Sequence, residues 1–325
     1  MLKNNKSVRI RIISILTLSI ILIGTFSTVA TATTYYSTLA KGTEFFQVST
    51  FNETAWQTTV STNSNPSDWF EGDANITGAQ SKFTTMGWTS VTWEMYDVLT
   101  LIILTDIDAL NVLMTIGQFG YNETEINDNY TNTYSLISGI RSEWYFISGA
   151  FNESYNSATD MSIILSNPID YKKILDDYND LVSVIQADFF GPADATVKAV
   201  FQNMTADDFL WQIALNNLAM GSPISMYIEE LVDSLGCENA SYSGNKLIIE
   251  RIGEANYTVE LTYGVQGTLT SFVVKDATGT IIYQFISMGN TNWIVYIIVG
   301  VIVGCLSVVV VYIAYKKRKF NKLIR

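Results

Sequence analysis

Histidine is missing from the 325-residue chain, while cysteine and proline are scarce, with two and four residues. Without an imidazole, the chain cannot build a Ser-His-Asp or Cys-His catalytic centre, a histidine-ligated zinc or haem site, or a histidine pH switch. The glycine motifs of hydrolase nucleophile elbows, phosphate loops and dinucleotide-binding folds are also missing. No cofactor is indicated, and we expect a protein that is not an enzyme.

The two cysteines, Cys237 and Cys305, cannot form a disulfide within a folded domain, because Cys305 lies in a long apolar run. The region before that run must therefore be stabilised by a hydrophobic core, for which its length of about 260 residues suffices. We interpret Cys237 as a small apolar core residue, with an intermolecular disulfide as the alternative.

Basic residues are rare between the two ends of the chain. Four of the 19 lie in residues 1–32 and six in residues 316–325, and neither segment has an acid. The region between them holds nine basic and all 31 acidic residues, a formal net charge of −22. This charge repels nucleic acid and anionic lipid, so we expect no nucleic-acid partner. A solvated surface is its simplest explanation, and cation attraction is the alternative.

The longest apolar run, Trp293–Tyr315, has 23 residues without a charge, and about 20 apolar residues span a bilayer as a helix. Aromatic residues lie near both ends, and the basic segment 316–325 follows. These features predict a transmembrane helix over 293–315 with a cytoplasmic tail. Gly300, Gly304 and Ser307 would permit close helix packing, and hence a homodimer through the membrane.

Residues 1–32 have the layout of a secretory signal peptide, with a basic start, an apolar segment and an Ala-Thr-Ala site. Cleavage after Ala32 would give a type I protein of the plasma membrane, with residues 33–292 outside. The alternative is an uncleaved N-terminal anchor, which would also place these residues outside.

Eight Asn-x-Ser/Thr triplets without proline at the middle position are distributed along this extracellular segment. Each triplet is weak by itself, but together they predict an N-glycosylated surface. The acceptors are Asn52, Asn75, Asn122, Asn129, Asn152, Asn203, Asn239 and Asn256.

The C-terminal part of the extracellular segment carries the clearest strand pattern. Residues 256–263 alternate between apolar and polar side chains, and glycine-containing turns separate them from strand-like runs at 246–252, 269–275 and 280–287. Connections this short join antiparallel strands. We therefore predict a four-stranded antiparallel meander.

Helices are predicted in the middle of the chain, at 105–120, from Pro168 to about Phe189, from Thr205 to about Gly221, and from Ser222 to Gly236. Strands are expected at 42–60 (two, joined by a turn), 82–105 and 134–151, with polar loops at 63–78 and 122–133. The fold class is thus α+β: an antiparallel sheet from both ends of the chain, with inserted helices and a following transmembrane helix.

Adjacent carboxylates are the remaining source of chemistry, at Asp106/Asp108, Asp176/Asp177, Asp207/Asp208 and Glu229/Glu230. A glycosidase-like centre needs two acids about 5 to 9 Å apart in a cleft, and calcium needs several converging oxygens. Neighbouring acids on a helix point in different directions, so we interpret Thr105–Asp108 and Thr205–Asp208 as helix starts.

Six tryptophans precede the apolar run, with many tyrosines and phenylalanines, and we expect most of them in the core. We interpret the chain as a non-catalytic cell-surface protein that recognises or scaffolds an extracellular partner. One alternative is a binding module for a lipid or apolar small molecule, which requires a cavity of a few hundred Å³ lined by Trp, Tyr and Ile. The other is a carboxylate-based surface hydrolase.

Overall fold

The computed structural model describes residues 35–104, 113, 122–149, 157–187, 195–216 and 218–288. Several predicted features lie outside these residues: the signal peptide, Asn152, the span 293–315 with Gly300, Gly304 and Ser307, and the tail. Of the helix predicted at 105–120, only Leu113 is described, and it is helical. Among the helices of the described residues, none is long and apolar enough to cross a membrane.

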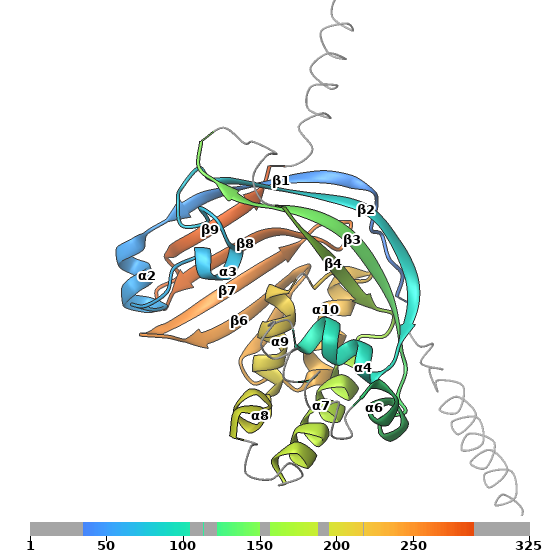
Figure 1. Ribbon diagram of the computed structural model, residues 1–325. Helices are drawn as coiled ribbons and strands as arrows, with labels where there is room; N and C mark the ends of the chain where they lie inside the picture. The colour runs from blue at the N-terminus through green and yellow to red at the C-terminus, as the bar shows by residue number, and fades with distance from the viewer. Residues whose placement is uncertain are drawn as a thin grey trace, which may run out of the picture. The chain divides into compact units, whose positions relative to one another are not determined.

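A nine-stranded antiparallel sheet forms the framework of the described residues, and it curves into a half-barrel around the helices (Figure 1). The strand order is β4-β3-β2-β1-β9-β8-β7-β6-β5. The strands are β1 (Gly42–Phe51), β2 (Gln80–Trp93), β3 (Tyr134–Ile147), β4 (Ser157–Leu165), β5 (Ala240–Ser243), β6 (Lys246–Ile252), β7 (Asn256–Tyr263), β8 (Leu269–Asp276) and β9 (Ile281–Ser287).

The predicted C-terminal meander is confirmed, because β6, β7, β8 and β9 pair in sequence as antiparallel neighbours. The alternation in β7 buries Tyr257, Val259, Leu261 and Tyr263. The short strand β5 extends the meander by one strand, and it was not predicted because four residues carry little periodicity.

The two ends of the described chain meet in the middle of the sheet, where β1 pairs with β9 from Phe46↔Ser287 to Phe51↔Tyr283. The N-terminal strands therefore extend the sheet, as predicted, with β2 and β3 continuing beyond β1. The edge strand β4 follows β3 and was not predicted.

The helices of the middle region are confirmed, with shorter boundaries: α7 (Asp170–Gln186), α9 (Ala206–Leu215) and α10 (Ile224–Leu235). Thr205 caps α9, since its side chain accepts from the Asp208 N–H. Gly236 ends α10 in the left-handed conformation. Helix α7 buries the complete predicted stripe of Tyr171, Ile174, Leu175, Tyr178, Leu181, Val182 and Ile185. The small helix α8 (Ala195–Val200) contacts α7.

Four predictions were wrong, and two of these errors concern an asparagine. Residues expected to form a second strand after β1 form helix α2 (Glu53–Thr59), and those expected as a loop form α6 (Glu123–Asn129). Asn52 and Asn122 are the N-caps, each accepting a backbone N–H three residues later; both had been interpreted as turn or loop residues.

The third error concerns the end of the second predicted strand region, where β2 stops at Trp93. The chain continues as α4 (Met95–Val98) and a π-helical turn, η1 (Leu99–Ile103). Glu94 and Asp97 form a capping box, whose side chains bond to each other's backbone N–H. The β-branched residues that suggested a strand are explained by burial, since Ile102 and Ile103 are both buried.

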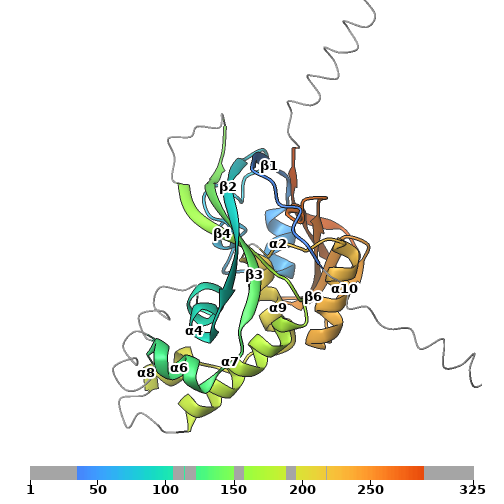
Figure 2. The same cartoon turned by 90° about the vertical axis from the view of Figure 1, so that its right-hand side faces the viewer.

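One hydrophobic core cluster, made from strands and helices alike, runs through the described residues. Figure 1 and Figure 2 show α7 and α9 on the concave side of the curved sheet, and α10 contacts α7, β5 and β6. The fourth error is the loop predicted at 63–78, because it contains the short helix α3 (Ser67–Phe70), which brings Trp69 and Phe70 against the aromatic side chains of the sheet. This arrangement leaves a cavity between α3, α9 and the sheet.

Candidate functional site

A cavity of about 250 Å³ lies between the sheet and the helices, with lining residues from six strands or their ends, from α3 and from α9. Its walls are mainly phenylalanines of the inner sheet face: Phe46 of β1, Phe83 of β2, Phe272 of β8 and Phe285 of β9. Helix α9 contributes Ala214 and Leu215, and the following segment contributes Leu218 and Ala219. Of these residues, Ala214 and Ala219 have small side chains, which leave space between α9 and the sheet.

The phenylalanines are fixed by aromatic contacts within the sheet. The rings of Phe272 and Phe285 stack at 5.5 Å, and those of Phe46 and Phe83 stack at 5.4 Å. Phe70 of α3 meets Phe272 edge-on at 4.8 Å. Such geometries stabilise aromatic clusters beyond simple burial, so the apolar wall is preformed.

A cavity of a few hundred Å³ is what the alternative of a lipid-binding or apolar small-molecule module requires, but the lining differs from the one expected for it. Phe predominates where Trp, Tyr and Ile were expected, since only Trp69 and Tyr145 of those types line it. A signal for the phenylalanine lining was present in the sequence. Phe46 and Val48 are two residues apart and both buried, as are Tyr283 and Phe285, so each pair marks the face of its strand that points toward the core.

Glu71 and Asn216 are the exposed residues of the lining and so mark its opening. Glu71 has φ 55 and ψ 164, a region that is nearly restricted to glycine and that costs about 1–3 kcal/mol for other residues. Such strain persists only where the surrounding structure enforces it. Here the enforcing contacts are made by the two residues that follow, Gly72 and Asp73.

We call residues 71–73 the mouth strap. Gly72 forms a bridge with Phe146 of β3, and the Asp73 N–H donates to the Phe146 carbonyl at 2.7 Å. The Asp73 carboxylate accepts from the Ser148 hydroxyl at 2.6 Å and from the Ser148 N–H at 2.7 Å. These two hydrogen bonds lower the pKa of Asp73. The strap therefore fixes the position of Glu71 at the cavity opening.

The opposite wall is fixed by the segment Leu218–Met220. The Ala219 N–H donates to the Ile163 carbonyl of β4 at 3.2 Å, and the Met220 N–H to the Gly267 carbonyl at 2.8 Å. Gly267 approaches so closely that an added Cβ would lie 2.0 Å from the Met220 carbonyl oxygen. Thr268, the next residue, lines the cavity.

The predicted carboxylate pairs that lie among the described residues are engaged in contacts within the fold. Asp176 pairs with Lys172, Asp177 accepts from the Tyr134 hydroxyl at 2.8 Å, and Glu229 accepts from Tyr242 at 3.1 Å. The Glu230 carboxylate accepts from the Tyr35 hydroxyl. Asp106 and Asp108 lie outside the described residues. These contacts give the carboxylates roles in packing.

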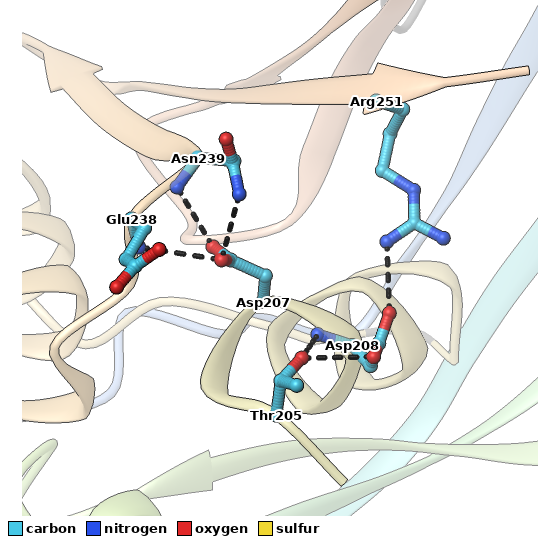
Figure 3. A network of polar contacts seen from close by, with 6 residues as sticks. All are labelled: Thr205, Asp207, Asp208, Glu238, Asn239 and Arg251. Carbon is cyan, nitrogen blue, oxygen red and sulfur yellow. Dashed lines mark hydrogen bonds and ion pairs between the residues drawn. The ribbon is translucent and has the colours of Figure 1, made fainter.

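Asp207 and Asp208 lie beside an open cleft of about 790 Å³, but their oxygens face away from each other (Figure 3). Asp207 accepts from the backbone N–H of Glu238 and Asn239 and from the Asn239 amide. Asp208 pairs with Arg251 at 3.2 Å and accepts from Thr205 at 2.8 Å. The two carboxylates attach α9 to the segment before β5 and to β6.

Within the described ranges, no group of three or more Cys, Asp or Glu residues is placed to hold a metal ion. Cys237 is half-buried, and burial, together with the nearby Asp207 carboxylate, raises the pKa of its thiol to about 12. A neutral thiol fits the interpretation of Cys237 as a packing residue.

Of the predicted acceptor asparagines, Asn52, Asn122, Asn129, Asn203, Asn239 and Asn256 are exposed, and Asn75 is half-buried. Asn52 and Asn122 use their side-chain oxygens as helix caps. Asn129 and Asn239 instead donate from the amide nitrogen, to the Glu125 carbonyl at 2.7 Å and to Asp207 at 3.0 Å. The nitrogen that would carry a glycan is thus engaged in two of these sites.

The tryptophans do not all lie in the core. Trp56 and Trp93 are buried, Trp69 and Trp211 are half-buried, and Trp88 is 48% exposed. The Arg251 guanidinium lies 5.1 Å from the centre of the Trp211 ring, a cation–π distance.

Comparison of the chain with protein-family models, with curated proteins and with solved structures finds no match in any of the three.

Proposed function

We propose that this chain is a single-pass, type I protein of the cell surface, whose extracellular domain is non-catalytic and binds an apolar small molecule in the cavity between the sheet and α9. The observation that carries the proposal is the preformed aromatic cavity of about 250 Å³ with a defined opening at Glu71. Ligand pockets are typically concave, mostly apolar and provided with a few polar groups.

The apolar segment 293–315 and the signal-like segment 1–32 support the membrane topology, and the exposed acceptor asparagines agree with a glycosylated exterior. The cleft beside Asp207 is bordered by residues of three acceptor triplets, namely Thr205, Asn239 and Asn256. The Asn239 amide is engaged by Asp207. Glycans on the other two acceptors, Asn203 and Asn256, would cover this cleft, and for this reason we assign binding to the aromatic cavity.

Native mass spectrometry of the segment Thr33–Asn292, secreted from a glycosylating host, tests the proposal. We expect an extra mass that survives enzymatic glycan removal and is released by organic solvent. A bare protein mass, obtained repeatedly from different hosts, would contradict the proposal and favour recognition of a protein partner.

A matched pair of variants locates the ligand. Ala214 lines the cavity from α9, so Ala214→Phe should fill the cavity and abolish the extra mass, at a cost in stability of about 1–3 kcal/mol. Ala199 is exposed on α8, so Ala199→Phe makes the same chemical change away from the cavity and should retain the extra mass. Retention by both variants would place any ligand elsewhere.

A further inference from the structure

Two hydroxyl-bearing residues with little exposed surface line the cavity, Ser162 within β4 and Thr268 just before β8. The residues are 5% and 7% exposed. Within the part of the chain that the structure describes, neither side chain forms a hydrogen bond. Neither hydroxyl oxygen is among the fully buried, unpartnered side-chain atoms of the described residues, so both remain accessible from the cavity. A polar group on a molecule inside the cavity can take the place of water as the hydrogen-bond partner of these hydroxyls.

The charge of the lining restricts what that polar group is. Glu71 is the charged residue of the lining, and its carboxylate has no ion pair or hydrogen bond among the described residues. No lysine or arginine lines the cavity. A second carboxylate or a phosphate would therefore lose its hydration beside a like charge and without a counter-ion, which is strongly unfavourable.

The volume restricts the apolar part of the ligand. A dry protein cavity of about 150 Å³ lined by aliphatic and aromatic side chains accommodates benzene. The cavity here has about 250 Å³, which by proportion accommodates about ten carbon atoms.

We propose that the cavity binds an uncharged apolar alcohol of about ten carbon atoms, whose hydroxyl is hydrogen-bonded by Ser162 or Thr268, and that Glu71 excludes the corresponding carboxylic acid. This inference rests on the proposed function, because it names the ligand class of the same cavity. The exposed position of Glu71 at the mouth strap places the excluding charge where a ligand enters.

The test uses the full-length chain in native membranes and two photoreactive probes of equal chain length, a decanol and a decanoic acid that each carry a diazirine. After irradiation at pH 7.5, labelled peptides are identified by mass spectrometry. We expect the alcohol to label peptides containing Phe46, Phe83 or Phe285, and the acid to label them at least about tenfold less. Mapping the adducts separates the cavity from probe dissolved in the bilayer.

Three variants test the named residues. The double variant Ser162→Ala/Thr268→Val should reduce cavity labelling by the alcohol about fivefold, because a hydrogen bond is lost. Glu71→Gln should increase labelling by the acid and leave labelling by the alcohol unchanged. Glu53→Gln is the control, because it removes an equal charge from an exposed residue of α2. It should change labelling by neither the acid nor the alcohol.

The outcomes separate the two proposals. Equal labelling of the cavity by acid and alcohol in the native chain would overturn the exclusion by Glu71, while the apolar site itself would stand. Failure of both probes to label the cavity in every variant would overturn the ligand class and the proposed function together. If the double variant fails to fold, Glu71→Gln still tests whether Glu71 excludes the acid, because this exposed residue can be replaced without disturbing the core.

Discussion

Single residues control the cavity opening through backbone conformation. Gly72 has φ 62, and a Cβ added there would lie 2.3 Å from the Phe146 carbonyl oxygen. We expect Gly72→Ala to lower the free energy of unfolding by about 2 kcal/mol, because it adds strain and breaks the bridge to β3. Chemical denaturation of the secreted domain measures this change.

Gly42 is the matched control for this substitution. An added Cβ there meets nothing within 4 Å, so Gly42→Ala should change stability by less than about 0.5 kcal/mol. Equal effects of the two substitutions would contradict the role assigned to the mouth strap.

Cys237 is predicted to be an unreactive thiol. Its pKa of about 12 results first from burial and then from the Asp207 carboxylate, so almost no thiolate exists at pH 8. We expect peptide mapping after iodoacetamide treatment at pH 8 to show little modification of Cys237 in the folded protein and full modification in urea. Rapid alkylation of the native protein would contradict this prediction.

At the scale of secondary-structure elements, an ion triad connects three strands of the meander. Glu260 of β7 lies between Lys246 of β6 at 2.7 Å and Lys275 of β8 at 2.6 Å, and its side chain is only 14% exposed. Burial alone would raise the pKa of Glu260, but hydrogen bonds from the two lysines outweigh this effect and lower it.

Replacement of this carboxylate should weaken the sheet. Glu260→Gln leaves two lysines without their anion, and we expect a loss of about 1–2 kcal/mol in the free energy of unfolding. Glu250→Gln is the control, because Glu250 is exposed on the neighbouring strand β6 and should be close to neutral. Thermal unfolding of both variants measures the difference, and equal melting temperatures would contradict a stabilising triad.

At the scale of the whole molecule, three carboxylates with lowered pKa values make the free energy of unfolding depend on pH in the acidic range. The pKa values of Asp73, Glu260 and Asp276 are lowered in the folded chain, for Asp73 and Asp276 chiefly by hydrogen bonds to serine or threonine. Groups with lowered pKa values stabilise the fold above their unfolded pKa values, about 4, and lose this contribution as the pH falls through the folded values.

We therefore expect the unfolding free energy of the secreted domain to fall as the pH decreases from about 5 to 3. Glu260→Gln should make this dependence shallower, since one linked carboxylate is removed. A stability that rises over this range would show that relief of the repulsion within the acidic domain dominates instead.

Local patterns in the sequence determined much of this fold. The alternation in β7 and the three-and-four spacing in α7 each reflect one buried face, and both elements form as predicted. Thr205 and Gly236 act at helix ends as their types suggest. These features depend on residues a few positions apart, so the sequence alone contains their cause.

The tertiary structure alone decided the pairing of β1 with β9, the helix-capping roles of Asn52 and Asn122, and the cavity itself. The cavity combines Phe46, Ser162 and Phe285, which are far apart in the chain, with Glu71, whose backbone conformation is enforced by contacts with β3. Its shape depends on which side chains meet across the sheet and how closely α9 approaches. Such long-range contacts leave no periodic signal in the sequence, since they arise only when the strands and helices pack together.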